Sequence, residues 1–363
     1  MLSLKDYAKI PQKAISLYQL MKHGDKLCMQ DIYIGSIFMH EEIPVRLAHR
    51  IQELECLPRE LVEEPLVMQV KELYHSSWTD CVKLEKLDYN IKDLKDSSVK
   101  EYIDNVYETM SRIKRRHVNI VELLARGVKS YLNAQKYTLS DKFCLHEFLN
   151  GFYTSRIGIR CLLGHHLALY DQLKTNDLDP NWIGIICKRT NILQVCKNAV
   201  QDAIMVFEAH YGPFTAPKVS FCAIGKHPEL NYIPNHLHHI MFELAKNSLR
   251  ATYDAHGHKD NMPEVKVIVT EGSEDVTIKL ADEGGGIPRT AERLIWTYGY
   301  TTAEGFVDND KVPLAGFGYG LPLSRLYARY FGGDLNVISM DGYGTDAYVN
   351  LRRLSDTYEP IIN

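Results

Sequence analysis

Several classes of protein are excluded by what this sequence lacks. Its apolar runs fall well short of the ~20 residues that a membrane-spanning helix needs, so we expect no membrane span. There is no basic excess, because 42 Lys and Arg stand against 46 Asp and Glu. This balance argues against a nucleic-acid partner. The eight cysteines form no Cys-x-x-Cys pair and do not cluster with histidines, which predicts reduced core thiols and no cysteine-based metal site.

The first half of the chain shows helical periodicity and almost no strand-like alternation. Residues 1–22 are amphipathic and basic, and we expect them to form the first helix. Further on, apolar residues recur every three or four positions in residues 41–56, 65–87, 97–133 and 141–172. This pattern predicts a helical bundle that ends at the polar stretch 174–180.

The second half of the chain mixes helical and strand patterns. Alternating apolar residues predict strands at 219–224, 265–269 and 276–280, and a closing hairpin at 334–351. The expected architecture is a mixed sheet with helices packed on one face. The predicted fold class is therefore α+β, with a helical bundle at 1–178 followed by an α/β sandwich at 179–363. The 363 residues are enough for two such domains.

One predicted helix, residues 234–253, carries a line of polar side chains. Leu237, Ile240 and Leu244 form an apolar stripe, and Asn235 could cap the start of the helix. Successive steps of four, four and three place four polar residues on one face: His239, Glu243, Asn247 and Arg250. A solvated surface would look similar, but the flanking residues are apolar as well. Polar groups on a mostly buried helix need partners, and a ligand is one such partner.

Two glycine-rich segments follow this helix. Residues 282–288 read Asp-Glu-Gly-Gly-Gly-Ile-Pro at the end of a predicted strand, and residues 316–322 read Gly-Phe-Gly-Tyr-Gly-Leu-Pro before a predicted helix. Glycines let backbone amides approach phosphate oxygens, and the N-terminus of a helix adds its dipole. Tight structural turns are the alternative for each segment taken separately.

Four motifs, in this order, resemble the ATP-binding fold of gyrase, a heat-shock chaperone, histidine kinases and mismatch-repair ATPases. They are Glu243-x-x-x-Asn247-x-x-Arg250, Asp282-x-Gly284-x-Gly286, Gly316-x-Gly318-x-Gly320-Leu321 and Gly344-Thr345. The phrases at 242–252, 322–335 and 342–348 are similar to those of pyruvate dehydrogenase kinases. Nearly the whole chain resembles the mitochondrial 2-oxoacid dehydrogenase kinases. Residues 38–48 resemble the family segment that helps to hold the lipoyl domain of the complex core, although core packing is an alternative role for them.

The resemblance implies a role for each motif. Glu243 would act as general base, oriented by His239, with Lys246 and Arg250 near the phosphates or supporting the site. Asp282 would accept a hydrogen bond from adenine, although it could instead cap the following turn. The amide oxygen of Asn247 suits Mg²⁺ that is bound mainly by phosphates and water. The remaining expected ATP contacts are Arg250, Gly284, Gly286, Thr301, Thr302, Gly316, Phe317, Gly318, Tyr319, Gly320, Leu321 and Thr345, with residues 296–316 as a lid.

The function implied by the resemblance is that of an ATP-dependent protein serine kinase in the mitochondrial matrix. Its substrate would be the decarboxylase alpha subunit of the pyruvate dehydrogenase complex, its docking partner the lipoyl domain of the acyltransferase core, and its assembly a homodimer. A branched-chain 2-oxoacid dehydrogenase kinase is the alternative within the family, and residues 158–169 resemble it. A catalytically silent nucleotide-binding scaffold is a further alternative, although the intact motifs argue against it. A true histidine kinase is disfavoured, because no phosphoacceptor helix or receiver domain is recognisable.

Two residues in the helical half predict a regulatory site. His117 lies on the apolar line of the predicted helix 97–133, and Arg156 lies on that of the helix 141–172. A lone buried histidine is usually satisfied by its neighbours, but a buried guanidinium calls for an anionic partner. No Asp or Glu occupies either stripe near them. We therefore expect a cationic pocket for a small carboxylate, which by resemblance would be an inhibitor such as pyruvate or a halogenated analogue.

Overall fold

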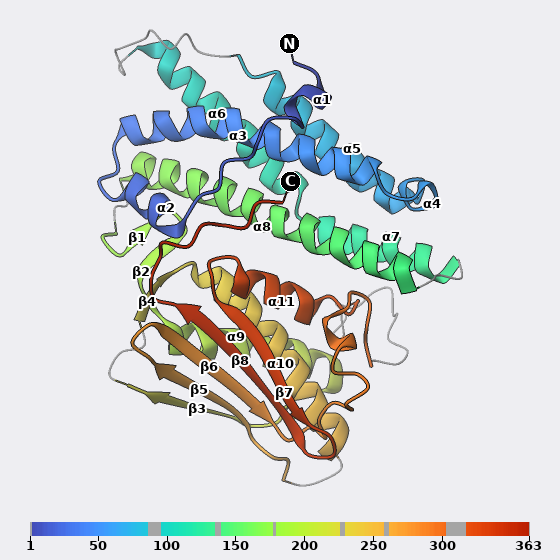
Figure 1. Cartoon of the computed structure of the whole chain (residues 1–363). Coiled ribbons are helices and arrows are strands. Elements are labelled where there is room, and N and C mark those ends of the chain that lie inside the picture. The colour runs from blue at the N-terminus through green and yellow to red at the C-terminus, as the bar shows by residue number, and fades with distance from the viewer. Residues whose placement is uncertain are drawn as a thin grey trace. The chain divides into compact units, whose positions relative to one another are not determined.

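The computed structural model describes residues 2–85, 96–134, 139–176, 179–225, 229–257, 261–302 and 317–362, with residues 139–143 as backbone only (Figure 1). The chain forms two compact units. The first comprises Met1–Ile186 together with Glu359–Asn363, and the second comprises Cys187–Tyr358. The division falls a few residues after the predicted one at 178, and the last residues of the chain lie with the first unit.

The first unit is a helical bundle built from eight described helices. They are α1 (Leu4–Tyr7), α2 (Leu17–Gly24), α3 (Met29–Glu55), α4 (Arg59–Val62), α5 (Pro65–Val82), α6 (Ser97–Arg116), α7 (Ile120–Ala134) and α8 (Leu139–Thr175). Local signals explain several starts, because Ser16 and Gln19 form a capping box before α2 and Pro65 opens α5. The apolar stripe of α3 is fully buried at Ile43, Leu47 and Ile51, so this helix lies at the centre of the bundle's core.

Three helical predictions for this unit were wrong in detail. Residues 1–22 do not form one helix, since α1 and the start of α2 are separated by an irregular stretch. The expected helix 97–133 is two helices, α6 and α7, with a break at residues 117–119. The helix expected to begin at 41 begins at Met29 and continues through Pro44. Proline is tolerated there at the cost of one backbone hydrogen bond.

The second unit contains a five-stranded sheet in the order β3-β5-β6-β8-β7. Its strands are β3 (Val219–Ile224), β5 (Val265–Glu271), β6 (Asp275–Asp282), β7 (Asp334–Met340) and β8 (Gly344–Arg352), all predicted from the alternating pattern. β3 and β5 are parallel, and the other pairs are antiparallel. The predicted mixed sheet is therefore confirmed.

Helices cover one face of this sheet (Figure 1). They are α9 (Ile192–Tyr211), α10 (Pro234–His256) and α11 (Gly320–Arg329), accompanied by the 3-10 turn η1 (Leu294–Trp296). Alternate strand residues such as Val267, Ile278 and Val349 are fully buried against them, which gives this unit its own core. Short strands β1 (Trp182–Ile183), β2 (Ile186–Asn191) and β4 (Glu229–Tyr232) were not predicted, and β2 pairs with β4.

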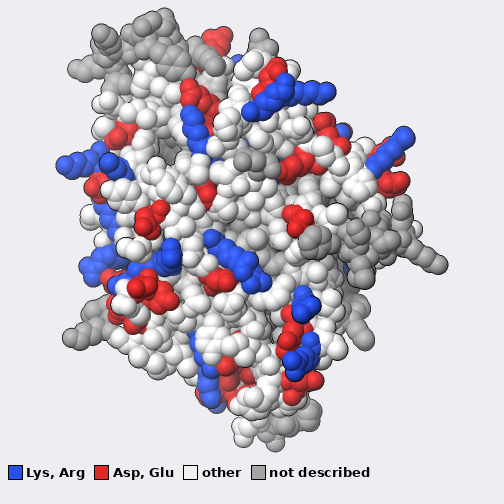
Figure 2. All heavy atoms as spheres, viewed as in Figure 1, with Lys and Arg blue, Asp and Glu red and all other residues white. Residues whose placement is uncertain are grey.

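On the face viewed in Figure 2, basic and acidic side chains are interspersed. No helix among the described residues is long and apolar enough to cross a membrane. All eight cysteines are free, but the prediction that they are core residues was wrong for Cys28, Cys56, Cys144 and Cys222, which are exposed.

Candidate nucleotide-binding and catalytic site

The Glu243 carboxylate lies where α10 meets the start of α11. One oxygen, Oε1, is 2.9 Å from the Lys246 ammonium, and both side chains are mostly shielded from solvent. The other oxygen, Oε2, lies so close to Gly320 that any Cβ there would clash with it. Gly320 is the first residue of α11, so the carboxylate faces the positive end of that helix. The carboxylate is thus held by a cation on one side and by a helix N-terminus on the other.

The rest of the polar line follows α10 as predicted. The His239 ring packs against Tyr327 of α11, with ring centroids 4.7 Å apart. Asn247 is exposed, so its amide is accessible to a ligand. Arg250 pairs with Asp254, 3.2 Å away, which favours a supporting role over a phosphate contact. The helix begins at Pro234 without a side-chain cap, so the expected Asn235 cap was wrong.

Asp282 ends β6 and is buried beside α10. Its carboxylate accepts hydrogen bonds from the Ser248 hydroxyl at 2.6 Å and from the Gly284 backbone N–H at 3.0 Å. Burial raises the pKa of this carboxyl, and the hydrogen bonds from Ser248 and Gly284 oppose part of that shift. The hydrogen bond from Gly284 shows that Asp282 caps the turn that follows β6, which was the alternative role expected for it. Capping leaves lone pairs of the same carboxylate available to a ligand, so both roles are compatible.

The first glycine segment packs tightly against its surroundings. A Cβ at Gly284 would lie 2.6 Å from the Cβ of Ala251, and one at Gly286 would clash with the Met340 carbonyl. Gly286 also has a φ of +74°, which disfavours other residues. Gly285 exchanges backbone hydrogen bonds with the turn that joins β7 to β8. Glycine is therefore required here by the protein's own packing, and this packing fixes the loop beside Asp282.

The second glycine segment leads into α11. Gly318 has a φ of +77°, and a Cβ there would clash with the Tyr300 carbonyl. Tyr319 is buried against Tyr298, while Phe317 and Leu321 are partly buried. Thr301 and Thr302 are exposed before this segment, and Thr345 pairs with Asp282 across β6 and β8. Gly316 and most of the expected lid, 303–316, lie outside the described residues.

The structure thus brings together Glu243, Asn247, Asp282 and the two glycine segments around α10. This arrangement fits ATP with Mg²⁺. A buried carboxylate lies beside a tight glycine turn, an exposed amide oxygen can serve a metal, and a helix N-terminus can face anionic groups. Two residues of this site were not predicted from the sequence. Ser248 holds Asp282, and the Ser339 hydroxyl accepts a hydrogen bond from the Ile287 N–H at 2.7 Å. Ser248 is off the polar line of the helix, so only its position beside Asn247 could have indicated it.

His117 and Arg156 meet in the first unit at the break between α6 and α7. Arg156 donates to the backbone carbonyls of His117 and Val118, at 2.9 and 3.3 Å. His117 Nε2 lies 2.9 Å from the Ser77 hydroxyl. Burial, followed by the nearby Arg156 and Arg116 guanidinium groups, lowers the pKa of His117 to about 3. The imidazole is therefore neutral at pH 7, and the positive charge of this region comes from its arginines.

Comparison with known families defines the class of protein. Residues 232–355 match the family described as histidine kinase-, DNA gyrase B- and HSP90-like ATPase. Residues 14–187 match the family described as mitochondrial branched-chain alpha-ketoacid dehydrogenase kinase. The second unit is therefore an ATPase domain of the histidine kinase and gyrase class, and it follows a helical domain typical of 2-oxoacid dehydrogenase kinases.

Full-length relatives identify the family. The chain is 40% identical over 362 residues to the mitochondrial pyruvate dehydrogenase (acetyl-transferring) kinase of Arabidopsis thaliana, covering 96% of this chain and 93% of that protein. It is 34% identical to the Schizosaccharomyces pombe kinase of the same name, covering 98% and 96%. It is 37% identical to human isozyme 3, covering 99% and 88%. The chain belongs to the mitochondrial 2-oxoacid dehydrogenase kinase family.

Proposed function

We propose that this protein is an ATP-dependent serine kinase of the mitochondrial matrix that phosphorylates and inactivates the decarboxylase alpha subunit of the pyruvate dehydrogenase complex. The observation that carries this proposal is the 40% identity to a pyruvate dehydrogenase kinase over 93% of that protein's length. The paired Glu243 and Lys246 side chains beside the start of α11 support an active enzyme.

The chemistry assigns a distinct task to each group. Glu243 accepts the proton of the substrate serine, and Lys246 and the N-terminus of α11 hold its carboxylate in place. His239 sits one turn earlier and positions this region through its packing on Tyr327. Asp282 would bind the adenine amino group, and Asn247 would hold Mg²⁺. ATP would supply the phosphoryl group, and Mg²⁺ would neutralise the charge of its phosphates.

A small-carboxylate site in the first unit is a second part of the proposal. The Tyr74 hydroxyl and Arg160 Nη1 are buried without a hydrogen-bond partner among the described residues. Burial raises the pKa of Tyr74 to about 12 even though Arg156, Arg50 and Arg160 act to lower it. Tyr74 therefore stays protonated and can donate. A carboxylate beside Arg156 would satisfy both donors, and such a ligand would act as an inhibitor.

Partner contacts follow from the same family assignment. β7 lies at the edge of the sheet and exposes Ile338 and Met340, which are 64% and 67% exposed. This edge is suited to a homodimer through the second units. The lipoyl domain of the acyltransferase core docks on the first unit. Most side chains of residues 38–48 belong to that unit's core, including Ile43 and Leu47, so exposed positions must make the contact.

Substrate choice is the test of the proposed function. Purified pyruvate and branched-chain decarboxylases should be incubated side by side with the protein and γ-labelled ATP. We expect label on serine of the pyruvate enzyme's alpha subunit at the higher rate, with loss of its decarboxylase activity. Faster labelling of the branched-chain enzyme would favour the alternative within the family, and this outcome has some support in the match of residues 14–187. Labelling of neither would favour a silent scaffold.

A further inference from the structure

The first unit contains a cavity that belongs to none of the sites described above. Its volume is about 710 Å³, and it lies among the end of α3, the short helix α4, the end of α7 and the first turns of α8. The C-terminal residue Ile362 also lines it. Small-molecule sites in proteins range over ~300–1,000 Å³, so this cavity is large enough for an organic ligand.

The interior of the cavity is apolar. Leu61 and Tyr131 are 1% and 9% exposed, so they form part of its inner wall. Leu132, Leu145 and Phe148 are partly buried and extend the apolar lining. An apolar group that binds against this lining removes apolar surface from water, which is favourable by ~25 cal/mol per Å². The interior of the cavity therefore suits the apolar part of a ligand.

The charged groups around the cavity are all acidic. Glu53, Glu60 and Glu147 line it, and no Lys or Arg appears among its described lining residues. Glu60 and Glu147 are exposed, so they mark its mouth, whereas Glu53 is partly buried. The cavity therefore combines an apolar interior with a negative entrance.

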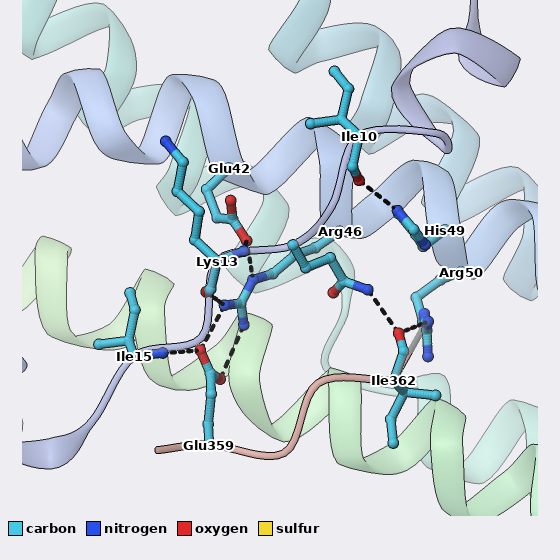
Figure 3. A network of polar contacts seen from close by, with 10 residues as sticks. Ile10, Lys13, Ile15, Glu42, Arg46, His49, Arg50, Glu359 and Ile362 are labelled. Carbon is cyan, nitrogen blue, oxygen red and sulfur yellow. Dashed lines mark hydrogen bonds and ion pairs between the residues drawn. The ribbon is translucent and has the colours of Figure 1, made fainter. Parts of the chain in front are cut away.

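Arg50 contacts residues that line the cavity, among them Glu53 and Ile362, and its contact with Ile362 is drawn in Figure 3. Its guanidinium pairs with Glu53 at 2.5 Å, and it also donates to the carbonyls of Gly151 and Ile362. Burial raises the pKa of Glu53 to about 7, although Arg50 opposes the shift. Arg50 is not among the described residues that line the cavity, and its two Nη atoms are engaged by Glu53 and by the two carbonyls. The two exposed carboxylates, Glu60 and Glu147, therefore make the entrance negative, and a negative entrance favours a cationic ligand.

We propose that this cavity binds an amphipathic organic cation, with its apolar body inside and its ammonium group at Glu60 and Glu147. An ion pair at the exposed mouth adds modest affinity, and burial of the apolar body supplies most of it. A carboxylate with the same apolar body would be repelled at the entrance. The site thus has the opposite charge preference to the arginine-rich region around Arg156.

Three molecules with the same eight-carbon body test this proposal. They are octylamine, octan-1-ol and octanoate, and their binding to the full chain is measured by calorimetry. Two thiols, Cys56 and Cys144, line the cavity and are exposed, so their alkylation rates report its occupancy. Cys28 and Cys222 are exposed thiols that do not line it, and they serve as internal controls. Mass spectrometry follows all four thiols in one sample.

We expect octylamine to slow alkylation of Cys56 and Cys144 while Cys28 and Cys222 react as before, with weaker protection by octan-1-ol and the weakest by octanoate. In the double variant Glu60→Lys and Glu147→Lys, octanoate should bind more tightly than octylamine and protect the two cavity thiols better. Each carboxylate should contribute about two- to fivefold in affinity, the range of exposed ion pairs. Glu101→Lys, an exposed charge change on α6, is the matched control and should leave the order unchanged.

Three results would overturn the proposal. One is the absence of octylamine binding at the cavity thiols, and another is equal protection of all four thiols. The third is that octylamine still protects the cavity thiols better than octanoate in the double charge-reversal variant. This result would show that Glu60 and Glu147 do not select the cation. Octanoate bound at Arg156 would not protect Cys56 or Cys144, so it would not be mistaken for occupancy of the cavity.

Discussion

Gly320 and Lys246 position the Glu243 carboxylate from opposite sides. Lys246 is one turn away on the same helix, whereas Gly320 is 77 residues further along the chain and touches the other carboxylate oxygen. The spacing of the polar line predicted Glu243, because i, i+4 geometry is local. The contact with Gly320 could not be predicted, since it depends on how α11 packs against α10. From the sequence, Gly320 was expected only to let its backbone approach a ligand.

The variant Gly320→Ala should lower kcat strongly and change ATP affinity less. The added methyl group displaces the Glu243 carboxylate, and a displacement of ~1 Å at a catalytic group can cost on the order of a hundredfold in rate. Steady-state kinetics with ATP and the decarboxylase would measure both constants. Gly164→Ala is the control, because the nearest atom to a Cβ there is 3.6 Å away. A normal kcat in Gly320→Ala would show that this contact does not position the base.

At the scale of elements, the break between α6 and α7 shows a limit of periodicity. Apolar residues keep their helical spacing through residues 117–119, so the pattern predicted one helix. The structure ends α6 there, and Arg156 of α8 donates to the two carbonyls at the end of the helix. A cation at a helix C-terminus is favourable. Arg156, from a helix that is distant in the sequence, therefore stabilises the break between α6 and α7. The spacing of apolar residues within 97–133 gives no information about this contact.

Loss of the Arg156 side chain should strongly weaken inhibition by small carboxylates. We expect Arg156→Ala to raise the half-inhibitory concentration of a halogenated pyruvate analogue by about ten- to a hundredfold, because charged hydrogen bonds contribute ~1.5–3 kcal/mol. Kinase assays across inhibitor concentrations would measure it, with Arg156→Lys as the variant that keeps the charge. Thermal unfolding of both variants would report the separate effect of losing the carbonyl contacts. Unchanged inhibition in folded Arg156→Ala would contradict the assignment.

At the scale of the whole molecule, the last residues of the chain are tied to its first ones (Figure 3). Glu359 pairs with the buried Arg46 at 2.5 Å. Its carboxylate accepts a hydrogen bond from the Ile15 N–H, and its own N–H donates to the Ile15 carbonyl. Gln12 donates to the Ile362 carbonyl at 2.7 Å. Breaking such a buried pair typically costs ~3–5 kcal/mol. The partners are more than 300 positions apart, so no local pattern indicated the contact, and the C-terminus was predicted to belong to the catalytic domain.

The sequence predicted the main sheet well, because its strands alternate buried and exposed residues as β5 and β6 do. It missed β2, whose burial pattern is irregular, and β4, which alternates over only four residues. The ATP-binding motifs could be recognised from the sequence because each one is a short continuous segment. The hydrogen bonds that join them, such as that from Ser248 to Asp282, could not be recognised.

The most direct test of the central claim compares wild-type protein with Glu243→Gln in transfer of label from γ-labelled ATP to the pyruvate decarboxylase alpha subunit. Loss of a general base should lower the transfer rate by about 10²–10⁴-fold. Calorimetry on the same preparations should give nearly equal ATP affinities, because the Glu243 carboxylate contacts Lys246 and Gly320 and the adenine-binding group is Asp282. A Glu243→Gln protein that transferred phosphate at a near-normal rate would contradict the account.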